Sequence, residues 1–305
     1  MDKKLTILLG TLVLIVIVLV FARQIFPNQQ KSIQNNDKVG VVAAENFYGD
    51  IVKQLGGEHV SVVSILSNPN VDPHEYESNV QNALAVTNAN IVIENGLDYD
   101  TWIDKLLSAS PNNNRILLVG GKLASHPLPD NPHVWYGIDN MPTIAQAITN
   151  SLKKVDPKDA KEFDANLVKF DASLNPLTAK MAEIKTKYGG SPVGLTETIY
   201  LYQTGPEGLN VLTPFEFERA IAEGNDPSVA DVKTTNDQID QKEVKILIYN
   251  NQTITPVTTN LQSAADQLGI PIVPVSETMP PQDHYQSWMM SQLDNLEVAL
   301  QKVAQ

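Results

Sequence analysis

The stretch "KDAKEFDANLVKFDASLNPLTAKMAEIKTK", residues 158–187, contains no strand candidate. Its apolar residues recur at alternating steps of three and four, which predicts an amphipathic helix with one apolar face. At about 1.5 Å per residue, this helix would extend roughly 45 Å. Asp156-Pro157 is typical of a helix N-cap followed by a first-turn proline, Pro176 should kink the helix, and Gly189-Gly190 should end it.

On both sides of this helix, short apolar runs alternate with helical patterns, as is typical of α/β proteins. Strand candidates before the helix are residues 39–45, 59–66, 90–95 and 115–120, and those after it are 192–197, 244–250 and 271–277. The sequence therefore predicts two α/β lobes with mainly parallel sheets, joined by a single long backbone helix. The expected domains are an N-terminal lobe at 39–138, a helical linker at 139–189 and a C-terminal lobe at 190–305.

The N-terminal residues predict a membrane anchor or a signal peptide. Residues 5–22, "LTILLGTLVLIVIVLVFA", carry no charge and are at the length threshold for a membrane span. Lys3 and Lys4 precede this run, so the positive-inside rule leaves the following chain outside the cytoplasmic membrane, at the cell surface or in the periplasm. Small residues up to Ala22 also allow cleavage there, although an anchor is favoured. Residues 1–22 are thus the expected anchor or signal, and 23–38 a polar linker.

Composition excludes several classes of function. The formal net charge of -13 argues against nucleic acid or anionic lipid as the main partner. The chain contains no cysteine, which excludes disulfides, thiolate zinc sites, cysteine nucleophiles and a cysteine-linked lipid anchor.

Two histidines and two glutamates lie where a ligand would bind. Open α/β sheets bind ligands beyond the carboxyl ends of their strands. His74, in "SNPNVDPHEYES" (67–78), and His133 come from the first half, while Glu197 and Glu277 end strand candidates of the second. Imidazole nitrogens and carboxylate oxygens together suit Zn²⁺, Mn²⁺ or Fe²⁺. A loop histidine or strand-end glutamate is more often an ordinary surface residue, so the residues alone leave both interpretations open.

The other histidines have simpler interpretations. His59 and His126 are expected to be surface residues. His284 is expected in the first turn of the last helix with Asp283 as its N-cap, and metal capture is the less favoured alternative for either residue.

Five motifs in order carry a resemblance to a known family. They are "DPHEYE", "NPHVWYG", "LTETIYLY", "ILIYNNQT" and "SETMPPQDHYQSWM", with the long helix between the second and the third. Together they resemble the metal-binding solute receptors of bacterial zinc and manganese ABC transporters, the TroA-like family, from residue 39 to the end of the chain. The resemblance implies two lobes joined by one long helix with the metal buried between them.

The resemblance also implies roles for individual residues. His74 and His133 match the two histidine ligands of the N-terminal lobe, and Glu197 falls where many members have a third histidine. Glu277 falls near the final acidic ligand, although another alignment places Ser276 there. By analogy with other metal sites, Gln252 and Tyr249 are expected to support Glu277.

These features predict a receptor and not an enzyme. It would capture one divalent ion, Zn²⁺ or Mn²⁺ in preference to Fe²⁺, and deliver it as a monomer to the membrane permease of an ABC importer. Glu197 in place of histidine shifts the preference toward Mn²⁺ or Fe²⁺, whereas the Irving–Williams order favours Zn²⁺. Two alternatives are a secreted metallohydrolase, with His74 and His133 as ligands and a glutamate base, and a surface adhesin stabilised by metal.

Overall fold

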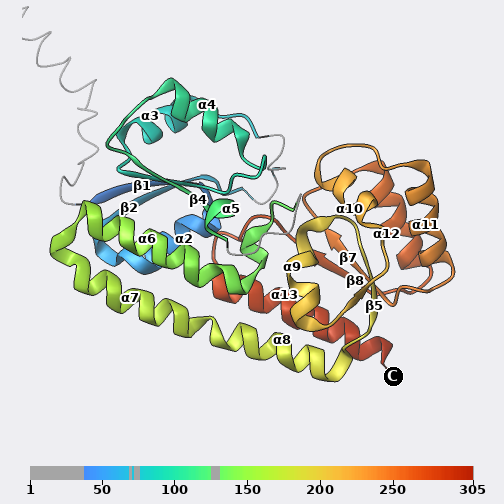
Figure 1. The fold of residues 1–305 in the computed structure, drawn as a ribbon. Helices are drawn as coiled ribbons and strands as arrows, with labels where there is room; N and C mark the ends of the chain where they lie inside the picture. Colours follow the sequence, from blue (N-terminus) through green and yellow to red (C-terminus); the bar gives the residue numbers. More distant parts are fainter. Residues whose placement is uncertain (1–37, 69–70, 72–75, 125–130, 305) are drawn as a thin grey trace, which may run out of the picture. The chain divides into compact units, whose positions relative to one another are not determined.

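The computed structural model describes residues 38–68, 71, 76–124 and 131–304 (Figure 1). The residues from Lys38 onward form one compact unit. The expected anchor or signal at 1–22 and most of the linker therefore lie outside the described residues, as do His74 and His126. Among the helices that the structure describes, none has the length and apolar character needed to cross a membrane.

The first sheet contains four parallel strands in the order β2-β1-β3-β4. The strands are β1 (Val39–Glu45), β2 (Val60–Leu66), β3 (Ile91–Glu94) and β4 (Ile116–Val119). The helices of this lobe are α2 (Asn46–Gly56), η1 (Gly57–His59), α3 (Val80–Asn88), α4 (Thr101–Ala109) and α5 (Gly120–Leu123). Successive residues of β1 enter different clusters: Val41 and Ala43 pack with α2, Val42 and Ala44 with α3 and α4. Because helices cover both faces of the sheet, β1 is apolar almost throughout.

The second sheet repeats this plan with the order β6-β5-β7-β8, again all parallel. Its strands are β5 (Pro192–Leu195), β6 (Asn210–Val211), β7 (Ile246–Asn250) and β8 (Ile272–Val275). Its helices are η6 (Thr198–Tyr200), α9 (Leu201–Glu207), α10 (Phe215–Ala222), α11 (Val229–Asp240), α12 (Pro256–Gln267) and α13 (Tyr285–Val303). The sequence did not predict β6, because two residues are too few for a periodic signal. The prediction of two α/β lobes is confirmed.

The connection between the lobes is helical, as expected, but the long helix is interrupted. It comprises η3 (Val134–Tyr136), η4 (Ile138–Asn140), α6 (Met141–Val155), η5 (Pro157–Asp159), α7 (Ala160–Ser173) and α8 (Asn175–Tyr188). The break between α7 and α8 falls at Leu174, and Pro176 lies in the first turn of α8, where its missing N–H costs no helical hydrogen bond. Figure 1 shows the two helices running end to end beneath both lobes.

One apolar core extends through both lobes. It joins side chains of both sheets to α2, α6, α7, α8 and α13, and its centre is an aromatic layer of Phe47, Trp135, Tyr136, Tyr200 and Trp288. Phe47 stacks on Trp135 at 4.5 Å and on Trp288 at 6.1 Å between ring centroids. Burying a large apolar side chain contributes on the order of 1.5–3 kcal/mol, so this layer is a major link between the lobes.

Candidate metal centre

Three of the four predicted ligands come together in the structure. His133, Glu197 and Glu277 each offer one ligand atom, and these atoms all lie within 4.8 Å of one another. All three side chains are buried, and His133 Nε2 lies 3.9 Å from Glu197 Oε2. His74, the fourth predicted ligand, falls outside the described residues.

Asn131 fixes the imidazole of His133. Its Oδ1 accepts a hydrogen bond from the backbone N–H of His133 at 3.1 Å and lies 2.9 Å from the ring Nδ1. The Nδ2 of Asn131 donates to the carbonyl of Thr198 at 3.0 Å, which orients its amide. Because Oδ1 acts as an acceptor, Nδ1 donates to it, and Nε2 is the ring nitrogen on the side of Glu197.

Glu197 begins a short helical turn beyond the carboxyl end of β5. Its Oε2 accepts the backbone N–H of Ile199 at 2.9 Å, and its Oε1 accepts from Asn250 Nδ2 at 2.9 Å. Burial, followed by the negative charge of Glu277, raises the pKa of Glu197 well above its usual range, while these hydrogen bonds lower it in part. A cation between the two carboxylates would relieve this unfavourable charge.

Glu277 is held at both carboxylate oxygens. Asn250 Nδ2 and the hydroxyl of Thr253 donate to Oε1 at 2.7 and 2.8 Å, and the hydroxyl of Tyr99 donates to Oε2 at 2.7 Å. The backbone N–H of Glu277 donates to Gln252 Oε1 at 2.7 Å. Gln252 therefore lies where it was expected, although it contacts the backbone of Glu277 and not its carboxylate.

Tyr249 has a different surrounding from the one expected. Burial raises the pKa of Tyr249, and a side-chain hydrogen bond with Thr258 in α12 lowers it in part. Its hydroxyl thus faces α12. Sequence reasoning missed Asn250, which ends β7, and Tyr99, which follows β3, although both lie at the carboxyl ends of parallel strands, where the glutamates were found.

Tyr99 reaches Glu277 from a strained turn. Gly96, Leu97 and Asp98 all have positive φ angles, 72°, 57° and 63°. The carboxylate of Asp100 accepts the backbone N–H groups of Asn95 and Gly96 at 2.6 and 2.7 Å, which holds this conformation. Left-handed backbone at a non-glycine residue costs roughly 1–2 kcal/mol, so the turn is maintained by its surroundings.

A cavity of about 380 Å³ adjoins this turn. It is lined by Asp98, Tyr99 and Asn131 from the first half of the chain and by Ala222 and Glu223 from the second. The acidic side chains at its wall favour the approach of a cation.

The other histidines differ in their surroundings. His284 is the N-cap of α13, and Asp283 precedes the cap, so the expected N-cap role of Asp283 is wrong. The Nδ1 of His284 lies 2.7 Å from Asp50 Oδ1, which explains its position without a ligand. His59 ends η1, and two carboxylates contact its ring. His126 lies outside the described residues.

The donor set fits a divalent transition metal, because an imidazole nitrogen and two carboxylates combine borderline and hard ligands. The family profile described as "Zinc-uptake complex component A periplasmic" matches residues 41–299. A "Putative metal-binding protein" of Treponema pallidum is 26% identical over 179 residues, which are 51% of this chain and 56% of that protein. The "Iron ABC transporter substrate-binding lipoprotein MtsA" of Streptococcus pyogenes serotype M6 is 28% identical over 203 residues, 62% of each chain. The matches thus span little more than half of these relatives.

Solved structures agree with the fold. The periplasmic zinc binding protein TroA of Treponema pallidum superposes with a TM-score of 0.74 at 19% identity, covering 86% of this chain and 99% of that one. FpvC of Pseudomonas aeruginosa in complex with Mn²⁺ superposes with a TM-score of 0.72 at 21% identity, covering 87% and 99%. The resemblance drawn from the five motifs is confirmed. The chain belongs to the ZnuA family, the zinc-uptake complex component A proteins.

Proposed function

We propose that this protein captures a divalent transition-metal ion between its two lobes and delivers it to the permease of an ABC importer. The observation that carries the proposal is the group of three buried donors, His133, Glu197 and Glu277, whose ligand atoms lie within 4.8 Å of one another. Two adjacent buried carboxylates are costly without a compensating charge, and a cation supplies it.

The proposed ligand set is completed by His74. Four protein ligands enclose an ion without leaving a position for a reactive water, unlike a catalytic zinc site. Such a site would bind the ion without catalysing a reaction, as is expected of a receptor. The names of the relatives support this function, since they include metal and iron ABC transporter substrate-binding lipoproteins.

We propose Zn²⁺ or Mn²⁺ as the cargo. Two glutamates make the site harder than a three-histidine site and thus more favourable for Mn²⁺, but the Irving–Williams order predicts the higher affinity for Zn²⁺. Competition of the two ions for the same protein, followed by elemental analysis, measures this preference.

The proposed location of the protein is outside the cytoplasmic membrane, where an importer collects its cargo. The apolar residues 5–22 would attach the protein to the membrane there. A permease is the proposed protein partner.

The test is calorimetric titration of the full-length chain, kept in detergent because of residues 5–22. His74→Ala and Glu197→Gln should each weaken binding of Zn²⁺ by orders of magnitude without unfolding the metal-free protein. The matched control is Glu216→Gln, since Glu216 is 62% exposed and pairs only with Arg219 on α10 among the described residues. Unchanged affinity in both ligand variants would refute the proposed site.

A further inference from the structure

A second cluster of donors lies where the N-terminal lobe meets the turn between α6 and α7. His59 at the end of η1, together with Asp156 and Asp159 around η5, offers three ligand atoms within 4.8 Å of one another. His59 Nδ1 is 2.8 Å from Asp159 Oδ2. The cluster shares no residue with the candidate metal centre.

Asp156 is the unexplained member of this cluster. It occupies the N-cap position of η5, as its sequence context predicts, yet its side chain makes no capping hydrogen bond. The residue is 7% exposed, and within the described part of the chain its Oδ2 has no hydrogen-bond partner. A buried acceptor without a donor costs on the order of 1–3 kcal/mol. Burial raises the pKa of Asp156, followed by a side-chain hydrogen bond with Asp159 and by the charge of Asp159, and a bound cation would reverse this effect.

Glu162 on α7 supports the imidazole from its other side. Its Oε2 lies 3.1 Å from His59 Nε2. A carboxylate on one ring nitrogen and a metal on the other is the usual arrangement around a metal-bound histidine, because the carboxylate fixes the tautomer and the ring orientation. His59 packs edge-on against Phe163 at 5.8 Å, which further restricts the ring.

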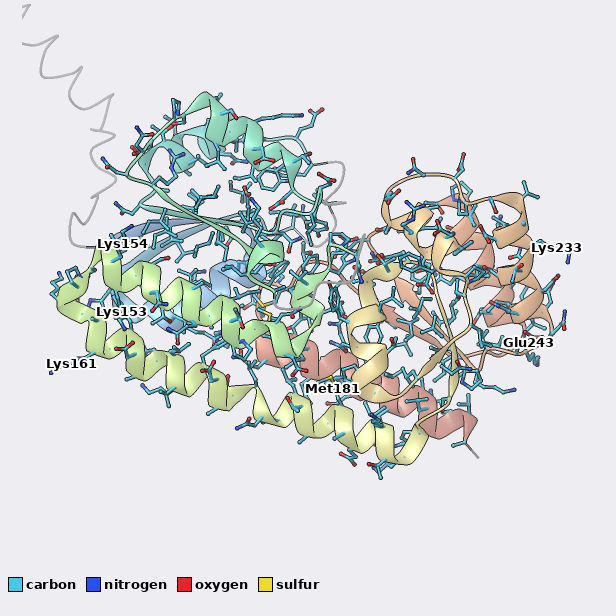
Figure 2. All side chains as sticks on the ribbon, in the orientation of Figure 1. Lys153, Lys154, Lys161, Met181, Lys233 and Glu243 are labelled. Atoms are coloured by element: carbon cyan, nitrogen blue, oxygen red, sulfur yellow. The ribbon has the colours of Figure 1, made fainter. Side chains whose placement is uncertain are left out.

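The charges around the cluster favour an added cation. Three carboxylates, those of Asp156, Asp159 and Glu162, face the single imidazole of His59. The nearest ammonium is that of Lys158, 3.8 Å from Asp159 Oδ2, on a side chain that is 63% exposed and can swing into solvent. Figure 2 labels three more lysines near this end of α6 and α7, at 153, 154 and 161. Of these, Lys153 pairs with Asp164 at 2.7 Å, outside the cluster.

We propose that His59, Asp156 and Asp159 bind a second divalent transition-metal ion, with Glu162 orienting the imidazole. The imidazole favours a first-row ion such as Zn²⁺ over Ca²⁺ or Mg²⁺. Three protein ligands at a partly exposed place leave positions for water, so this ion exchanges more readily than one in the buried centre. The ion ties the start of β2 to the turn between α6 and α7. Its binding is independent of cargo capture.

The experiment counts Zn²⁺ ions on the full-length chain in detergent, by equilibrium dialysis followed by native mass spectrometry. The wild-type chain should hold two ions, and Asp156→Asn or His59→Gln should hold one. A chain with Glu197→Gln and Glu277→Gln together should also retain one ion, which a further Asp156→Asn removes. The matched control is Asp164→Asn, which changes a neighbouring exposed carboxylate and should leave two ions bound.

Crystals of the wild-type chain grown with Zn²⁺ provide a readout that does not depend on any variant folding. An anomalous difference peak at the zinc edge beside His59 Nδ1 is expected. The inference is overturned if that peak is absent, or if folded Asp156→Asn and His59→Gln bind as many ions as the wild type; the group is then an ion-pair cluster around a protonated imidazole. If only the proposal for the buried centre is wrong, the ion that depends on Glu197 and Glu277 will be missing, and the ion at His59 will still be found.

Discussion

Replacing Glu277 with glutamine should abolish tight metal binding and at the same time stabilise the metal-free protein. The side chains of Glu277 and Glu197 are fully buried, and their ligand atoms lie within 4.8 Å of each other. Two negative charges at that separation would repel by roughly 3–4 kcal/mol at an effective dielectric constant of about 20, and this repulsion adds to burial in raising the pKa of Glu197. Glutamine removes one charge and keeps the shape of the side chain.

The surrounding hydrogen bonds can accommodate this glutamine. Its amide oxygen can take the place of Glu277 Oε1, which accepts from Asn250 and Thr253, and its NH₂ group can donate to the hydroxyl of Tyr99. Allowing for an imperfect fit, we expect the free energy of unfolding of the metal-free protein to rise by about 1–2 kcal/mol at neutral pH. In a chain of this size, that is roughly 2–4 °C in Tm per kcal/mol.

The pH dependence has a definite sign. The folded-state pKa of Glu197 is raised, partly by Glu277, so the folded protein holds a proton that the unfolded chain releases above about 4.5. Stability therefore falls as pH rises from that value through the folded pKa. With Glu277→Gln, this decline should be smaller, and the two proteins should converge near pH 4.

The assay is scanning calorimetry of chelator-treated protein at several pH values, beside calorimetric titration with Zn²⁺. Glu216→Gln removes an exposed charge and corrects for the effect of net charge. If metal-free Glu277→Gln melts below the wild type at neutral pH, or still binds Zn²⁺ with wild-type affinity, the account of the two carboxylates is wrong.

Three further outcomes are expected. Burial raises the pKa of Glu207 to about 8, so the free energy of unfolding of the wild type should fall by up to a few kcal/mol between about pH 4.5 and 8. In urea unfolding, Glu207→Gln should flatten this decline. The control Glu58→Gln, which changes an exposed side chain, should not. A Cβ at Gly120 would lie 2.1 Å from the buried hydroxyl oxygen of Tyr48, so Gly120→Ala should lower the free energy of unfolding by about 1–3 kcal/mol. A Cβ at Gly205 would have no neighbouring atom within 4 Å, so Gly205→Ala should be neutral or slightly stabilising in thermal melts. Saturating Zn²⁺, at about 100 times its Kd, should stabilise the folded chain by roughly 2.7 kcal/mol, and an unchanged Tm would contradict binding to the folded state.

The fold could be predicted because its signals are local. Apolar runs of four to seven residues marked seven of the eight strands, and the three-and-four repeat marked the helices between the lobes. Pro176 correctly indicated an irregularity there, which takes the form of a break at Leu174. The two-residue β6 was missed because its pairing with β5 depends on the tertiary fold.

The candidate centre could be predicted in part for a similar reason. Glu197 and Glu277 follow strands whose carboxyl ends meet at one edge of a parallel sheet, so topology brings them together. The group that bridges them, the amide of Asn250, lies on the intervening strand, and only the structure reveals its direction. The cluster around His59 was not predictable at all, because Glu162 lies 103 residues along the chain and its contact depends on how α7 packs.

The aromatic layer shared by the lobes would limit how an ion captured as proposed can leave. Swinging the lobes apart as rigid bodies would separate Phe47 from Trp288 and break the bond from the Tyr285 hydroxyl to the carbonyl of Trp135. Each exposed aromatic side chain would cost on the order of 1.5–3 kcal/mol, so such a motion would be slower than one that leaves these side chains buried. Displacing the strained turn that carries Tyr99 would break the contact of Tyr99 with Trp135, 5.0 Å between ring centroids, but would leave Phe47 on Trp135 and on Trp288. For the proposed cargo, we therefore expect substitutions in that short turn to change the residence time with less effect on the packing between the lobes.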